Sequence, residues 1–155
     1  MFNKFFENLI VGLLLLLILN VFLDVILRYV FNNSSIALQE MEWHLFSAMF
    51  LLGISYTLQH DSHVRVDFLY DKKSPKIKAT INILGFFVFI LPISLLIIIY
   101  GFDFAYEAFK LNEQSGDPGG LTNRFIIKSI IPISFLLVLI LGLTFLKNNI
   151  QLRKQ

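Results

Sequence analysis

His60 and His63 form the pattern in this sequence that comes closest to a metal-binding motif. Their spacing can place two imidazoles on one ion, with the Asp61 carboxylate nearby. Two histidines and a carboxylate on a polar loop are more often hydrogen-bonding groups than metal ligands. We therefore expect His60, His63, Arg65 and Asp67 to form a structural junction that fixes this loop against the helix ends.

Asp24 and Arg28 are the two charged residues inside the first apolar stretch, and they lie four residues apart. This spacing places both side chains on one face of a helix. A charge inside a membrane span costs about 2.5–3.5 kcal/mol. A lone carboxylate at this position would therefore need a functional reason, such as an ion or proton site. A carboxylate with its own cation makes a poor coupling site, so we interpret the two residues as a structural ion pair.

Glu40, Glu42, Trp43 and His44 are a dense group of polar and aromatic residues at the start of the second apolar stretch. Acidic residues are favourable in the first turns of a helix, and Trp is typical of the membrane interface. The same group also suits a contact surface for a partner subunit. The residues alone leave both interpretations open.

Arg124 and Lys128 lie one turn apart at the start of the last apolar stretch, and Asp103 and Glu107 lie one turn apart at the end of the third. If the two helices are neighbours, these residues can form a ladder of interhelical ion pairs. We predict such a ladder as a structural feature.

Motifs for catalysis and for cofactor binding are absent. The sequence has no Ser-His-Asp constellation, HExxH motif, P-loop or GxGxxG, and it contains no cysteine. His44 and His60 stand at opposite ends of one predicted helix, roughly 24 Å apart, so one chain cannot ligate a bis-histidine haem. A net charge of +2 is too small to suggest a nucleic-acid partner. We expect neither an enzyme nor a cofactor-binding protein.

Four long apolar runs position these residues, and 56% of the chain is hydrophobic. Crossing a bilayer core takes roughly 20 helical residues, and the runs lack the alternation of barrel strands. We predict an all-α integral membrane protein with a single four-helix domain, residues 1–155. The first apolar run is too long for a signal peptide and is expected to remain as a span. The predicted helices cover residues 5–31, 36–60, 75–110 and 122–149.

Lys and Arg residues predict the orientation. Placing both termini and the 60–78 loop on one side gives that side nine basic residues and leaves four on the other. The nine are Lys4, Arg65, Lys72, Lys73, Lys76, Lys78, Lys147, Arg153 and Lys154, and the four are Arg28, Lys110, Arg124 and Lys128. The positive-inside rule then puts the N- and C-termini in the cytoplasm and leaves a short, acidic outer face.

Small residues that would allow close helix packing are sparse. Ser47, Ala48, Gly53 and Ser55 in the second helix form the best candidate packing stripe. The helices contain no midplane polar site that suggests a substrate pathway. A chain of this kind is better suited to supporting another membrane protein than to transporting a solute alone.

Two segments, Leu38–Phe46 and His60–Phe68, resemble the small membrane subunit (DctQ type) of tripartite ATP-independent periplasmic (TRAP) transporters, and the resemblance covers nearly the whole chain. The most specific part is the His-Val-Arg-Val-Asp-Phe block after the second helix. Arg28 and Pro132 fit the same pattern. The Gln39–His44 block and the segment 117–121, which begins with Asp117, resemble the branch associated with mannitol or chloroaromatic compounds, some of whose members handle 2-oxo acids. One departure is that Met41 separates Glu40 from Glu42, where many relatives have adjacent acids.

The resemblance implies a scaffold subunit in the bacterial inner membrane. It would support a large elevator-type permease (DctM type), which carries the substrate and sodium sites, and would help dock a periplasmic substrate-binding protein (DctP type). On this basis Arg28, Glu40, Glu42, Trp43, His44 and Asp117 are interface candidates. The alternatives are a self-sufficient small transporter or exporter and a membrane anchor of an electron-transfer complex.

Overall fold

A computed structural model describes residues 2–59 and 73–154, and this part of the chain contains helices and no strand. The elements are α1 (Phe2–Tyr29), α2 (Ile36–Gln59), α4 (Pro75–Gly85), the π-helix η1 (Phe86–Ile90), α5 (Leu91–Lys110) and α6 (Phe125–Lys154). Three stretches, Lys4–Tyr29, Pro75–Lys110 and Phe125–Arg153, are long and apolar enough to cross a membrane. The all-helical prediction is confirmed. α2 is a fourth long helix, but it is not apolar enough to count as a candidate span.

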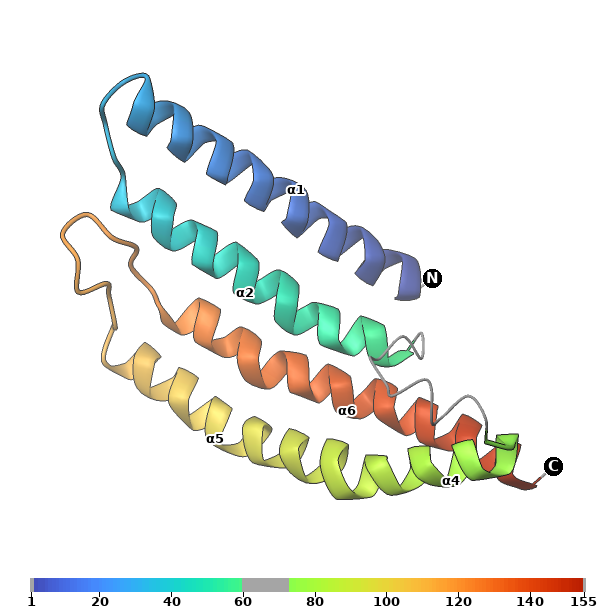
Figure 1. The fold of residues 1–155 in the computed structure, drawn as a ribbon. Helices are drawn as coiled ribbons and strands as arrows, with labels where there is room; N and C mark the ends of the chain where they lie inside the picture. The colour runs from blue at the N-terminus through green and yellow to red at the C-terminus, as the bar shows by residue number, and fades with distance from the viewer. Residues whose placement is uncertain (1, 60–72, 155) are drawn as a thin grey trace.

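The helices lie side by side in an open layer (Figure 1). α1 packs on α2, α2 packs on α6, and α6 packs on α4, η1 and α5. The two termini lie at one end, here called the terminal end, and the connections 30–35 and 111–124 lie at the other, here called the loop end. A layer of this kind leaves broad apolar faces exposed, such as those of Leu16 (54% exposed) and Ile99 (59%).

Left-handed asparagines set two helix boundaries that differ from the prediction. α1 ends at Tyr29 rather than at residue 31, because Asn32 takes a φ of 50° and the Asn33 N–H donates to the Leu27 carbonyl at 2.9 Å. α6 begins at Phe125 rather than at residue 122, because Asn123 takes a φ of 60° just before the helix. At its far end α6 continues to Lys154, beyond the predicted residue 149.

The predicted helix 75–110 is interrupted by one wide turn, η1. The buried residues Ala79, Phe86, Ser94 and Gly101 follow one another at spacings of 7, 8 and 7 residues. Seven residues nearly complete two α-helical turns, so the spacing of eight would rotate Phe86 by about 80° away from Ser94. A π turn takes up one extra residue and cancels this rotation. η1 therefore keeps one continuous face of α4 and α5 against α6.

Two glycines lie at close contacts between this face and α6, Gly101 in α5 and Gly142 in α6. A Cβ at Gly101 would lie 3.2 Å from the Pro132 ring of α6, and a Cβ at Gly142 would lie 2.8 Å from the Phe86 ring. The packing stripe predicted on α2 is correct for Ala48 and Ser55, which are buried. An added Cβ at Gly53 would meet nothing within 4 Å, so this glycine makes no close contact within the described chain.

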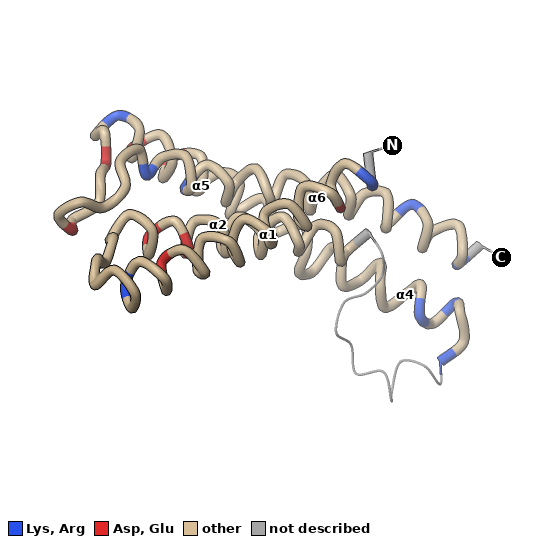
Figure 2. Tube along the Cα trace, turned by 90° about the horizontal axis from the view of Figure 1, so that it is seen from above, with Lys and Arg blue, Asp and Glu red and all other residues tan. Residues whose placement is uncertain are grey.

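Charged residues are divided unequally between the two ends (Figure 2). Within the described segments, the terminal end has seven Lys and Arg residues and one acid, Glu7. The loop end has four Lys and Arg residues and the seven acids Asp24, Glu40, Glu42, Asp103, Glu107, Glu113 and Asp117.

Candidate functional site

Glu40, in the polar first turns of α2, is the centre of the largest polar cluster at the loop end. Its carboxylate accepts hydrogen bonds from the Ser115 hydroxyl, from the Leu121 N–H at 2.6 Å and from Arg124 Nη2 at 2.8 Å. All three donors belong to the segment that joins α5 to α6, and only 14% of the Glu40 side chain is exposed. Glu40 therefore anchors this loop to α2.

The hydrogen bond from Ser115, with those from Leu121 and Arg124, lowers the pKa of Glu40 below its usual value near 4.5. Glu40 precedes the charge-free stretch 45–59, so this charge lies at the edge of the apolar region. The carboxylate is thus ionised at neutral pH and occupied by donors from its own chain.

The backbone of the loop folds tightly around this carboxylate. The Ser115 N–H donates to the Leu121 carbonyl at 3.0 Å, and the Gly120 N–H donates to the Asp117 carbonyl at 3.0 Å. Gly119 takes a φ of 82°, which favours glycine. A Cβ at Gly120 would lie 2.5 Å from the Ser115 Cβ and 2.8 Å from Glu40 Oε2, so only glycine fits there without rearrangement.

The predicted ion-pair ladder between Asp103 and Glu107 on one side and Arg124 and Lys128 on the other is wrong. Arg124 pairs with Glu40 instead. Asp103 and Glu107 are exposed, since they lie on the opposite side of α5 from its buried residues.

Lys128 also has a different partner from the one predicted. Its ammonium group pairs with Glu113 and lies 3.9 Å from the centre of the Phe104 ring. The Glu113 carbonyl accepts a hydrogen bond from the Arg124 N–H at 3.1 Å. The loop is therefore attached to α2 through Glu40 and to α6 through Glu113.

Asp24 and Arg28 of α1 form the ion pair suggested by their spacing. Asp24 is only 3% exposed, and its Oδ1 is buried without a hydrogen-bond partner in the described part of the chain. One turn away, Asn20 Nδ2 donates to the Leu38 carbonyl of α2 at 2.8 Å. Asn20, Asp24 and Arg28 thus lie on one side of α1, and Asn20 links that side to the first turns of α2.

The remaining candidates divide into exposed and half-buried residues. Trp43 is 74% exposed, Asp117 is exposed, and Glu42 and His44 are half-buried. The four residues of the predicted junction, His60, His63, Arg65 and Asp67, lie outside the described residues. Within the described segments, no three His, Asp or Glu side chains come together in a group that could hold a metal ion.

Comparison with known proteins identifies the family. Residues 17–152 match the profile of the DctQ component of tripartite ATP-independent periplasmic transporters. The chain belongs to this family. A protein of Haemophilus influenzae, provisionally named a TRAP transporter small permease protein, is 30% identical over 125 residues, which cover 77% of this chain and 74% of that protein.

As a DctQ-type small permease, the protein is a multi-pass inner-membrane protein and a component of a transporter rather than an enzyme. Sequence reasoning identified Glu40 but missed its partners Ser115, Leu121 and Arg124, and the close approach of Gly120. The Gly-Gly pair beside Asp117 and Pro118 was the available signal, because a tight turn that closes on a carboxylate needs residues without side chains.

Proposed function

We propose that this DctQ-type chain is the scaffold subunit of a sodium-coupled TRAP transporter for a small organic acid. In this proposal it supports the large elevator-type permease and helps receive the periplasmic binding protein. Sodium and substrate bind in the other subunits, and this chain carries no cofactor.

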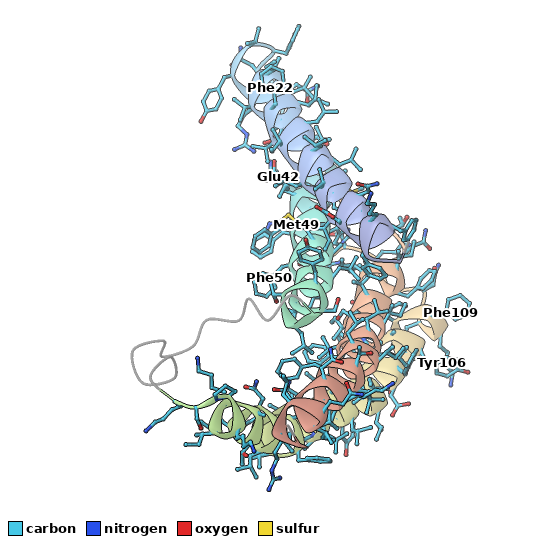
Figure 3. The ribbon with its side chains drawn as sticks, turned by 90° about the vertical axis from the view of Figure 1, so that its right-hand side faces the viewer. Phe22, Glu42, Met49, Phe50, Tyr106 and Phe109 are labelled. Atoms are coloured by element: carbon cyan, nitrogen blue, oxygen red, sulfur yellow. The ribbon has the colours of Figure 1, made fainter. Side chains whose placement is uncertain are left out.

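The observation that carries the proposal is the open helical layer together with the pairing of charged groups within the chain. Exposed aromatic and aliphatic side chains run along every long helix, as Phe22 and Phe50 illustrate (Figure 3). Near the apolar region, the carboxylates of Glu40 and Glu113 and one oxygen of Asp24 are engaged by groups of the same chain. Such a chain offers large surfaces for another membrane protein and few free polar groups for a solute.

The anchored loop supports a role in receiving the binding protein. By the positive-inside rule, the excess of Lys and Arg at the terminal end supports an orientation with the acidic loop end in the periplasm, both termini in the cytoplasm and all four helices crossing the membrane. Asp117 and Trp43 are then exposed at the periplasmic boundary, next to a loop that Glu40 holds in one conformation.

Reconstitution into liposomes tests the proposal. We expect sodium-driven uptake of an organic acid only when this chain, the large permease and the binding protein are all present. Uptake by this chain alone would contradict the scaffold role, and so would undiminished uptake by the large permease and binding protein without it. Empty liposomes and liposomes lacking the binding protein are the matched controls.

A further inference from the structure

The basic residues of the two ends differ in how they are paired. At the loop end, Arg28, Arg124 and Lys128 each form an ion pair with an acid of the same chain. At the terminal end, Lys76 of α4 is exposed and has no carboxylate partner within the described segments. Glu7 is the one acid that the described chain places at that end (Figure 2). The charge of Lys76 is therefore not neutralised by the described part of the chain.

α4 also presents an apolar stripe that points away from α6. Ile77, Ile81 and Leu84 follow one another at spacings of four and three residues, and they are exposed by 47%, 47% and 58%. Successive residues of a helix are rotated by about 100°, so the buried Ala79 lies about 160° from Ile77, on the side that packs against α6. Since α4 and α5 form one edge of the layer, the stripe faces outward (Figure 1).

Lys76 and Lys78 flank this stripe. By the same rotation they lie about 100° to either side of Ile77, where the charge-free stretch 79–102 begins. Lysine side chains at such a point extend along apolar surface and place their ammonium groups among the lipid headgroups. The positive-inside rule requires basic residues on this side of the membrane, but it does not require them on both flanks of an apolar stripe. The arrangement fits a molecule that joins an anionic group to apolar chains.

We propose that the start of α4 binds an anionic phospholipid, with the phosphate between Lys76 and Lys78 and an acyl chain along Ile81 and Leu84. A zwitterionic lipid fits less well, because its own cation offsets the attraction between the lysines and the phosphate. Each lysine near an anionic membrane surface strengthens association by about fivefold. The inference goes beyond the proposed scaffold function and needs only the membrane location of the chain.

Local quenching by spin-labelled lipids tests this site. The chain has no cysteine, so Leu84→Cys gives one thiol for a fluorophore, and the full chain is reconstituted in phosphatidylcholine vesicles. Half-maximal quenching should take at least about fivefold less spin-labelled phosphatidylglycerol than spin-labelled phosphatidylcholine. Leu96→Cys is the matched control, because Leu96 is also 58% exposed but lies in α5, nearer the loop end. It should show no preference for phosphatidylglycerol.

Removal of one charge gives the decisive comparison. In the Leu84→Cys chain, Lys76→Gln should reduce the preference for phosphatidylglycerol by about fivefold, and Lys76→Arg should retain it. Because Lys76 is exposed, both substitutions should keep the thermal stability of the chain. An equal preference at positions 84 and 96 would overturn the proposal, and so would a preference at position 84 that is undiminished in Lys76→Gln.

The same measurement in the complex with the large permease separates lipid from a protein partner. If α4 binds lipid, phosphatidylglycerol should quench the fluorophore at position 84 with the same preference in the complex. Loss of quenching by both lipids would mean that another protein covers the stripe, and would overturn the proposal. Failure of the chain to co-purify with the large permease would contradict the scaffold function, whereas the measurements on the full chain alone still decide the lipid site.

Discussion

Gly120 and Glu40 together determine the shape of the loop between α5 and α6. Gly120→Ala would place a Cβ 2.5 Å from the Ser115 Cβ and 2.8 Å from Glu40 Oε2, so the loop must move away from α2. We expect a loss of about 1–3 kcal/mol in the stability of the closed loop. Faster hydrogen exchange of the Leu121 N–H would report it.

Gly116→Ala is the control for this prediction, because a Cβ at Gly116 meets nothing within 4 Å. It lies in the same loop and should leave hydrogen exchange unchanged. Slow exchange at Leu121 in Gly120→Ala would mean that the close contact with Glu40 is not what holds the loop.

The same anchor predicts a pH dependence. The pKa of Glu40 is lowered in the folded protein, so the stabilisation is fully present above the usual value near 4.5 and is lost as the pH falls through the lowered pKa. Glu40→Gln removes this dependence. Protease cleavage of the loop should therefore differ between the natural chain and Glu40→Gln from pH 7 down to about 5, and the difference should shrink only in stronger acid. A difference that vanished between pH 7 and about 5 would contradict the assignment.

The ion pair of α1 predicts an asymmetric response to substitution. Arg28→Leu leaves the buried Asp24 carboxylate without its cation and should cost about 3–5 kcal/mol. The double variant Asp24→Leu/Arg28→Leu removes both charges and should recover most of that loss. Thermal unfolding of the isolated subunit in detergent measures both, and a double variant as unstable as Arg28→Leu would show that packing matters more than charge.

Sequence spacing predicts the Asp24–Arg28 pair but not the partners of Arg124. Residues four apart on one helix are neighbours whatever the tertiary fold, so their pairing can be read locally. Glu40 and Arg124 are 84 residues apart, and they meet because α2 and α6 are neighbours in the layer. The order of the helices is set by packing shape, which hydropathy does not encode. The ladder with Asp103 and Glu107 was predicted wrongly for a different reason: α5 and α6 are neighbours, but these two residues lie on the side of α5 opposite its buried residues.

At the scale of elements, hydropathy predicts the long helices but not η1. The segment Phe86–Ile90 is apolar throughout, so nothing in its composition distinguishes a π turn from an α turn. The spacing of the residues that face α6 was the only signal. It could be interpreted only once the buried residues of α4 and α5 were known.

Deleting Val88, an exposed residue of η1, tests the role of this wide turn. The deletion should convert η1 to ordinary α-helix but keep the buried faces of α4 and α5 in line, because seven residues would then separate Phe86 from Ser94. The hydrogen bond between Asn82 Nδ2 and Asn149 Oδ1, now 2.7 Å, should survive. Insertion of one alanine after Val88 is the opposite change and should rotate α4 by about 100°.

The insertion variant should therefore lose stability, and the deletion variant should keep it. Thermal unfolding of the two isolated subunits measures the difference. Equal destabilisation by both would mean that the length of the segment, rather than the direction in which α4 faces, is what α6 requires.

At the scale of the whole molecule, the helices form one open layer. Its broad apolar faces are exposed, while its loop end is held by the contacts of Glu40 and Glu113. A closed bundle would have buried the surface that the proposed scaffold role requires. The sequence indicates the membrane location from its apolar runs. The openness of the layer could not be predicted, because helices that face lipid and helices that face protein have similar compositions.

The charge division predicts the orientation of this layer, and single cysteines can test it because the natural chain has none. Ser74 at the terminal end and Asp117 at the loop end are both exposed. A membrane-impermeant maleimide added to spheroplasts, which lack the outer membrane, should label Asp117→Cys, whereas Ser74→Cys should react only after the inner membrane is opened. The physical reason is that Lys and Arg near the ends of the spans are retained in the cytoplasm, and the terminal end carries most of them. Labelling of Ser74→Cys in intact spheroplasts would show that the layer has the opposite orientation in the membrane. The anchored loop would then face the cytoplasm, beyond the reach of any periplasmic binding protein.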